Sequence, residues 1–248
     1  MQFVAANLAY RYLAFALMVS QANWFCQTLG LPRDHILTLE DVRQGSSVDL
    51  IDTNYFGGSI ETDNYFFGFD AGHICSFVKR GHGAQSDAVV KRQNNEWSRL
   101  HSMIGTNDAF VLATNWLGES GVKLSVLESN FTMTITQWKF YPQYQPTNGS
   151  GPLAKEPVLL PIFQVEWHGD FVRKGHKYHG ISVAKVIIFG PTKELWQCDV
   201  FSEGLVRQPL IHVKNLDKVL SISDKTFESY HDLQLSNFVA QFGGGGAK

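Results

Sequence analysis

Apolar positions recur with helical spacing near the start of each half of the chain. Residues 8–29 contain no Gly or Pro, and their large apolar side chains return every three or four positions before Gly30. In the second half, Thr106-Asn107-Asp108 supplies N-cap side chains for a helix that runs to about Ser120 and is closed by Gly121. We therefore predict one helix at the start of each half.

After each helix, short runs rich in β-branched and aromatic residues alternate with turn residues, which is typical of antiparallel strands. The clearest alternation is 131–136, where threonines alternate with apolar residues. The predicted strands lie at 47–53, 58–61, 65–69, 73–79, 131–136, 158–167, 181–189 and 195–201. We predict a link at 80–95, a short helix at 96–104 and a loop at 142–157.

The two halves share a local sequence pattern. Asn23-Trp24 aligns with Asn115-Trp116, and each pair lies near the end of a helix that a glycine closes, which indicates duplication of one helix-then-sheet unit. This order of elements resembles the cystatin-like and PepSY-like α+β modules, as in uncharacterised bacterial secreted proteins, where a helix lies across a curled sheet. The resemblance covers the order of elements in both halves and implies a fold but no activity.

We therefore predict an α+β fold of two helix-plus-antiparallel-sheet (cystatin/PepSY-like) units packed together. The first unit is expected at residues 1–95 and the second at 96–208. The remaining residues, 209–248, form a C-terminal extension that ends in a Gly-rich flexible tail.

The charge balance narrows the range of partners. The chain has 21 basic and 23 acidic residues and no Lys/Arg stripe, which argues against nucleic acid as a partner. The apolar segment 8–19 is shorter than the roughly 20 residues needed to cross a bilayer, so we expect no membrane span. The sequence does not fix the compartment, and a secreted or periplasmic protein whose export signal is absent from this chain is one interpretation.

Three cysteines, Cys26, Cys75 and Cys198, lie far apart and form no C-x-x-C motif. We expect three buried thiols, with one disulfide and a thiol as the alternative.

Two pairs in the first half could also carry chemistry. His73 and Cys75 share a strand face just after Asp70, and Glu61 lies two residues before Asp63. We interpret the first pair as a buried strand and the second as a solvated hairpin end.

The strongest candidate for metal chemistry is a group of four residues where one strand turns back toward the next. His168, Asp170, His176 and His179 lie between the strands predicted at 158–167 and 181–189. Imidazole and carboxylate groups are suitable ligands for zinc, so a metal-dependent hydrolase is one hypothesis. The alternative is a solvated polar hairpin, since His176 and His179 lack the helical H-E-x-x-H spacing.

An aromatic and proline-rich segment offers a candidate binding site. Tyr141 and Tyr144 precede a Gly/Ser stretch, which favours an exposed recognition loop, and Trp138 lies close before them. We therefore predict a non-enzymatic protein- or peptide-binding module without a cofactor. A zinc-dependent hydrolase and a structural subunit of a homo-oligomer, in which strand edges pair between copies, are the alternatives.

Overall fold

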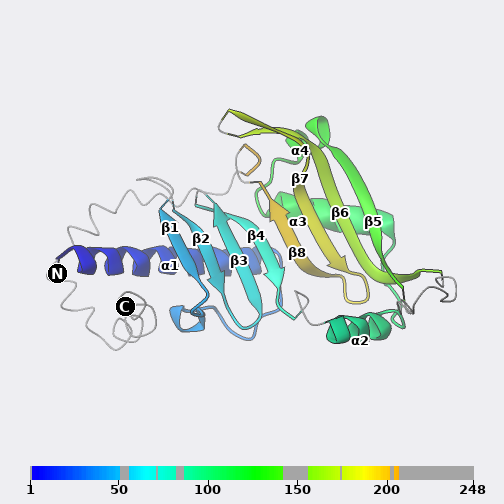
Figure 1. Cartoon of the computed structure of the whole chain (residues 1–248), viewed down its shortest axis with the longest axis horizontal. Helices are drawn as coiled ribbons and strands as arrows, with labels where there is room; N and C mark the ends of the chain where they lie inside the picture. Colours follow the sequence, from blue (N-terminus) through cyan, green and yellow to red (C-terminus); the bar gives the residue numbers. More distant parts are fainter. Residues whose placement is uncertain are drawn as a thin grey trace, which may run out of the picture. The chain divides into compact units, whose positions relative to one another are not determined.

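The computed structural model describes residues 2–50, 56–70, 72–81, 87–141, 156–173, 175–201 and 204–206. Its strands form an eight-stranded antiparallel sheet in the order β1-β2-β3-β4-β8-β7-β6-β5 (Figure 1). The chain divides into two compact units, of which unit 1 includes the residues up to Ser76 and unit 2 runs from Phe77 to Val206.

The prediction of two helix-plus-sheet units packed together is wrong, because the eight strands share one sheet. β4 (His73–Lys79) and β8 (Glu194–Val200) are hydrogen-bonded neighbours although they lie far apart in the sequence. Periodicity within a segment predicts strands and hairpins, but it carries no information on pairing between distant strands. Such pairing also removes two sheet edges that would otherwise be open. The predicted extension 209–248 lies outside the described residues.

Unit 1 is organised by α1 (Gln2–Thr28), which Figure 1 shows lying across strands β1 to β4. Phe25 of this helix packs edge-on against Phe67, with ring centroids 6.3 Å apart. Gly30 closes the helix with a φ of 61°, and the N–H of Leu31 donates to the carbonyl of Cys26 at 2.9 Å, a Schellman motif. Among the described residues, no helix is long and apolar enough to cross a membrane.

The strands of unit 1 are short and joined by tight turns. Ile60 lies opposite Phe67 in the ladder, so both side chains share the buried face under α1. A 3-10 turn, η1 (Leu39–Asp41), interrupts the loop between α1 and the sheet. The strands are β1 (Ser47–Leu50), β2 (Phe56–Glu61), β3 (Tyr65–Asp70) and β4, close to the predicted ranges.

The described residues of unit 2 form three helices and four complete strands. The helices are α2 (Asp87–Trp97), α3 (Thr106–Glu119) and α4 (Leu124–Asn130). The strands are β5 (Thr132–Phe140), β6 (Val158–Arg173), β7 (His176–Phe189) and β8. The helix expected at 106–120 is therefore confirmed, whereas most of the predicted short helix at 96–104 is irregular and α2 occupies part of the predicted link.

The face of this sheet that packs on α3 forms the core of unit 2. Ala109, Ala113 and Leu117 recur every four residues along α3 and are fully buried. In the sheet, Val165 lies opposite Val186, and both are fully buried as well. Figure 1 shows α3 crossing the strands on one side only, so the opposite face of β5 to β8 is free of α3.

Candidate functional site

The face of the unit 2 sheet opposite α3, here called the open face, carries polar side chains in cross-strand rows. Directly opposed residues of antiparallel strands lie on the same face, so the strand register defines each row. The three rows are Thr132–His168–Ser182, Thr134–Glu166–Lys185–Asp199 and Thr136–Gln164–Ile187–Gln197. These rows were not predicted, although polar residues at alternate positions of β6 and β8 are a signal in the sequence that could have revealed them.

Glu166 lies at the centre of the polar rows. Its carboxylate accepts a hydrogen bond from Gln164 at 2.7 Å and another from Ser182, and it lies 3.3 Å from His168 Nε2. Burial alone would raise the pKa of Glu166, but these hydrogen bonds and the nearby charges of His168 and Lys185 lower it below its ordinary value. Glu166 is therefore an ionised hydrogen-bond acceptor near pH 7 rather than a proton donor.

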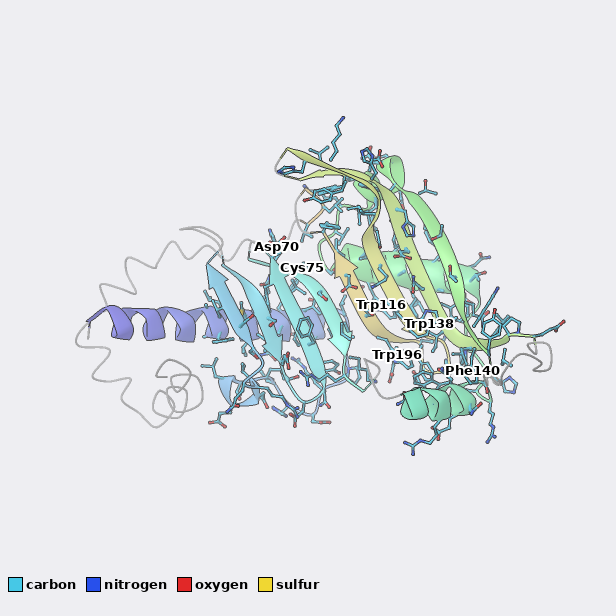
Figure 2. The ribbon with its side chains drawn as sticks, in the orientation of Figure 1. Asp70, Cys75, Trp116, Trp138, Phe140 and Trp196 are labelled. Carbon is cyan, nitrogen blue, oxygen red and sulfur yellow. The ribbon has the colours of Figure 1, made fainter. Side chains whose placement is uncertain are left out.

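The rows continue into an aromatic corner at one end of the open face. Trp196 stacks on Phe189, with ring centroids 4.3 Å apart and an interplanar angle of 12°, and Trp97 lies against both rings. The half-buried Trp138 packs on the same cluster, and its Nε1 donates to Gln164 Oε1 at 3.3 Å. Figure 2 shows Trp138, Phe140 and Trp196 near one end of the sheet.

Of the three predicted binding residues, Trp138 and Tyr141 lie in the described part of the chain. Trp138 joins the aromatic corner to the polar rows through its contact with Gln164. Tyr141 directly follows β5 and is 50% exposed, and its role in binding stays a prediction. Tyr144 lies outside the described residues.

Strand β5 forms an edge of the sheet. In the described part of the chain it pairs with β6 on one side and with no strand on the other. Its three threonines are exposed on the open face, and Met133, 37% exposed, points to the opposite face together with Ile135. The ladder is regular from Thr132 to Gln137 and shifts register before Lys139. No charged residue occurs before Lys139 in this strand.

The four residues proposed as metal ligands lie on β6 and β7, which extend further than predicted and form a two-stranded ribbon. At an irregularity in this ribbon, Asp170 accepts hydrogen bonds from His179 Nδ1 at 3.0 Å and from the N–H of Gly180 at 3.2 Å. These bonds hold the pKa of Asp170 below its ordinary value. His168 instead lies beside Glu166, and His176 is opposite Arg173 in the ladder.

Within the residues that the structure describes, no three His, Cys, Asp or Glu side chains are grouped closely enough to hold a metal ion. The structure thus brings together two of the four proposed ligands, His179 and Asp170. Zinc binding by all four residues stays a prediction. The observed contact between Asp170 and His179 links β6 to β7 within the ribbon.

Two of the three cysteines, Cys26 and Cys198, are buried as neutral thiols and are therefore poor nucleophiles. None of the three forms a disulfide. Burial raises the pKa of Cys26 to about 11 and that of Cys198 to about 12, so both thiols are neutral near pH 7. His73 is buried, and burial lowers its pKa, which favours the neutral imidazole. Its Nδ1 has no hydrogen-bond partner among the residues that the structure describes.

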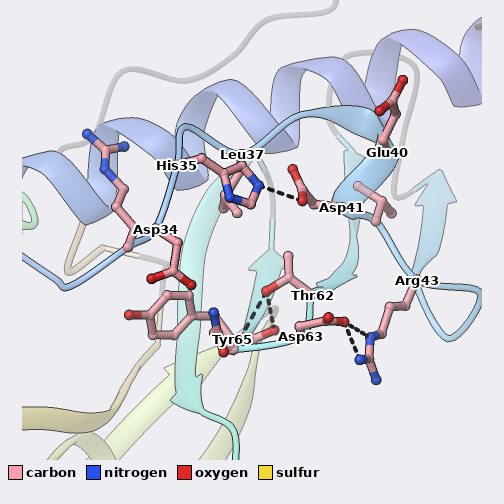
Figure 3. A pocket seen from close by; sticks show the side chains of 12 residues that line it. Asp34, His35, Leu37, Glu40, Asp41, Arg43, Thr62, Asp63 and Tyr65 are labelled. Carbon is pink, nitrogen blue, oxygen red and sulfur yellow. Dashed lines mark hydrogen bonds and ion pairs between the residues drawn. The ribbon is translucent and has the colours of Figure 1, made fainter.

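Unit 1 contains a polar pocket of about 260 Å³ between the loop after α1 and the β2–β3 turn (Figure 3). Two pairs of side chains lie in its lining: His35 is 2.7 Å from Asp41, and Arg43 pairs with Asp63. Burial alone would raise the pKa of Asp41, but hydrogen bonds from Thr38 and His35 lower it. The pair of Arg43 and Asp63 ties the loop to the turn, whereas the pair of His35 and Asp41 lies within the loop itself.

The fold is that of an α+β protein with a large antiparallel sheet, and the open face carries rows of polar side chains. We find no match to the chain among protein-family models, curated proteins or solved structures. The function must therefore be argued from the site itself.

Proposed function

We propose that this chain is a non-enzymatic binding module that holds an extended segment of a peptide or protein along β5. The observation that carries the proposal is the outer edge of this nine-residue strand, which pairs with no other strand in the described part of the chain. An edge strand presents a row of backbone N–H and C=O groups, and an added strand satisfies them.

The composition of β5 supports this assignment. Proteins commonly block exposed edges with Lys, Pro or inward-pointing charges, and β5 carries none of these from Thr132 to Trp138. Threonine, methionine, isoleucine and tryptophan in this run favour strand pairing. The edge is therefore competent to accept another strand, which is the feature expected of a binding site of this kind.

The neighbouring side chains supply specificity. A strand added to β5 would place alternate residues above the open face, beside Thr134 and Thr136, and the others beside Met133. Tyr141 and Trp138 lie at the C-terminal end of β5, where aromatic groups can pack on a side chain of the partner. Backbone pairing then supports affinity, and these side chains select the bound sequence.

The chemistry of the open face supports binding rather than catalysis. The acceptor oxygens of Glu166 and Asp199 are engaged by neighbouring side chains within the face. A general acid needs a raised pKa near the working pH, whereas the pKa of Glu166 is lowered. These groups are well suited to a fixed polar surface.

The proposal is tested by selecting binders from a random heptapeptide library against the immobilised full chain. Hydrogen exchange of the chain, with and without each selected peptide, then locates the binding site. We expect at least one peptide to slow exchange of the backbone amides of residues 132–140. Met133→Lys introduces a charge on the edge and should weaken that peptide's binding at least tenfold.

Val111→Lys is the matched control, because Val111 is 52% exposed on α3 and its replacement adds the same charge. This variant should bind the peptide within twofold of the unmodified chain. If no selected peptide protects β5, or if both variants weaken binding equally, strand addition at β5 is not the function.

A further inference from the structure

We propose that the segment held along β5 is the same strand of a second copy of this chain, paired antiparallel about Thr134. This inference rests on the proposed function and names its partner. Its basis is the sequence Thr132-Met133-Thr134-Ile135-Thr136. Threonine and apolar residues alternate in this run in the same order from either end.

The symmetry of this run makes the edge complementary to itself. In an antiparallel pair centred on Thr134, the residue numbers of opposed positions add up to the same value, so Thr132 faces Thr136 and Met133 faces Ile135 of the second copy. Opposed residues lie on one face of the joined sheet, which keeps the threonines together and the apolar pair together. Thr–Thr and apolar cross-strand pairs are favourable, and this register opposes no like charges.

The exposure of β5 is consistent with such a partner. Met133 is on the face that α3 covers, yet it is 37% exposed at the sheet edge. In the proposed register, Ile135 of the second copy would lie directly beside it. A partner strand would thus complete the apolar face where α3 leaves it uncovered.

Other registers fit less well. Pairing of the whole strand about Thr136 would oppose Met133 with Lys139 and Ile135 with Gln137. It would also include the shift in register that follows Gln137 in the β5–β6 ladder. The regular, uncharged part of the edge therefore favours the shorter pairing about Thr134.

Five opposed residues make a small contact compared with the roughly 800 Å² that each partner buries in a stable complex. We therefore expect a dimer that dissociates at low micromolar concentration and is populated at hundreds of micromolar. Sedimentation velocity of the full chain should show a concentration-dependent dimer. Met133→Lys should raise the dissociation constant of the dimer at least tenfold, and Val111→Lys should leave this constant unchanged.

Cysteine cross-linking tests the register. In a Cys75→Ser background, Thr134→Cys places two thiols opposite each other, at a separation that a disulfide can bridge. Oxidised glutathione serves as the oxidant. The control is Thr132→Cys, whose two copies would lie four residues out of register, about 14 Å apart at 3.4 Å per residue. We expect at least tenfold more cross-linked dimer for Thr134→Cys, and recovery of cross-linking in the double variant Thr132→Cys/Thr136→Cys.

Each result separates this inference from the proposed function. If the chain sediments as a monomer at hundreds of micromolar, or if Thr134→Cys cross-links no better than Thr132→Cys, self-pairing is overturned. A selected heptapeptide that still protects β5 would then leave the proposed function standing with a different partner. Absence of both self-association and peptide protection overturns both. Circular dichroism of each variant confirms that it is folded before the comparison is made.

Discussion

Asn23 fastens the loop after α1 to the end of that helix, and its replacement by alanine is a perturbation whose cost follows from the structure. The side-chain amide donates from Nδ2 to the carbonyl of Leu37 at 2.8 Å, and its Oδ1 accepts from the N–H of Leu37 at 2.8 Å. Arg33 adds a longer bond to the same Oδ1 at 3.3 Å. Asn23 thus pairs with one backbone residue as a neighbouring strand would.

The expected magnitude comes from the two short bonds. Each contributes about 1 kcal/mol net, because both partners are half-buried and water replaces the lost partner only in part. Asn23→Ala should therefore lower the free energy of unfolding of unit 1 by about 2 kcal/mol. This corresponds to a roughly 30-fold change in the unfolding equilibrium.

Urea denaturation followed by far-ultraviolet circular dichroism measures the global change. Hydrogen exchange of the peptide containing Leu37 measures the local one, and it should accelerate by at least tenfold. Asn115→Ala is the matched control, since Asn115 is exposed on α3 and occupies the aligned position in the second half. Its effect should stay within about 0.5 kcal/mol, as for most surface substitutions.

A loss below about 0.5 kcal/mol for Asn23→Ala would show that the two bonds to Leu37 do not stabilise unit 1. Equal losses for Asn23→Ala and Asn115→Ala would refute it as well, because the difference between the two sites is the basis of the prediction. Unchanged exchange at Leu37 would show that the paired bonds do not hold the loop.

Two further predictions concern titration. The thiols of Cys26 and Cys198, with pKa values of about 11 and about 12, should resist iodoacetamide at pH 8 in the native chain and react in 8 M urea; rapid native labelling of either would contradict their burial. The pKa of Glu166 is lower in the folded chain than in the unfolded chain, so its ionised carboxylate stabilises the fold at pH values above the unfolded-state pKa. This stabilisation is lost as the pH falls through the folded-state pKa. Glu166→Gln should therefore destabilise the chain at pH 7 and much less at pH 3. Urea midpoints at both pH values measure this, and an equal gap at each pH would show that the charge of Glu166 plays no part.

The elements with a strong local signal were predicted well. The helix that ends at Gly30 and the one that ends near Gly121 are both present, and both close with a Schellman motif. β4 has the predicted limits, since a continuous β-rich run with turn residues at its start defines it locally. The ribbon of β6 and β7 was missed in part, because its charged and glycine residues hide the alternation typical of a strand.

The shared Asn-Trp pattern shows how a one-residue difference changes the role of a side chain. Asn23 lies seven residues before its closing glycine and Asn115 six residues before its own. Successive residues of a helix are rotated by about 100°, so the two side chains point in different directions. Asn23 reaches Leu37, whereas Asn115 is exposed. Duplication of the two halves stays a prediction.

Among the site residues, local sequence identified candidates but not their partners. The sequence analysis grouped His168 with His179, yet the strand register places His168 beside Glu166 and leaves His179 with Asp170. An extra residue in one strand changes which side chains meet, and its position depends on the pairing of both strands. The polar rows of the open face likewise require the register of four strands.

Local sequence is enough to predict where the helices close and that Thr132 to Thr136 alternates between two faces, because these properties depend on neighbours along the chain. The lack of charge before Lys139 is a property of the same kind. The tertiary structure alone decided that β4 pairs with β8 and that β5 is left at the edge of the sheet. Strand order depends on contacts between residues far apart in the sequence. The same threonine-rich strand would have been an interior strand had another strand paired with its outer side.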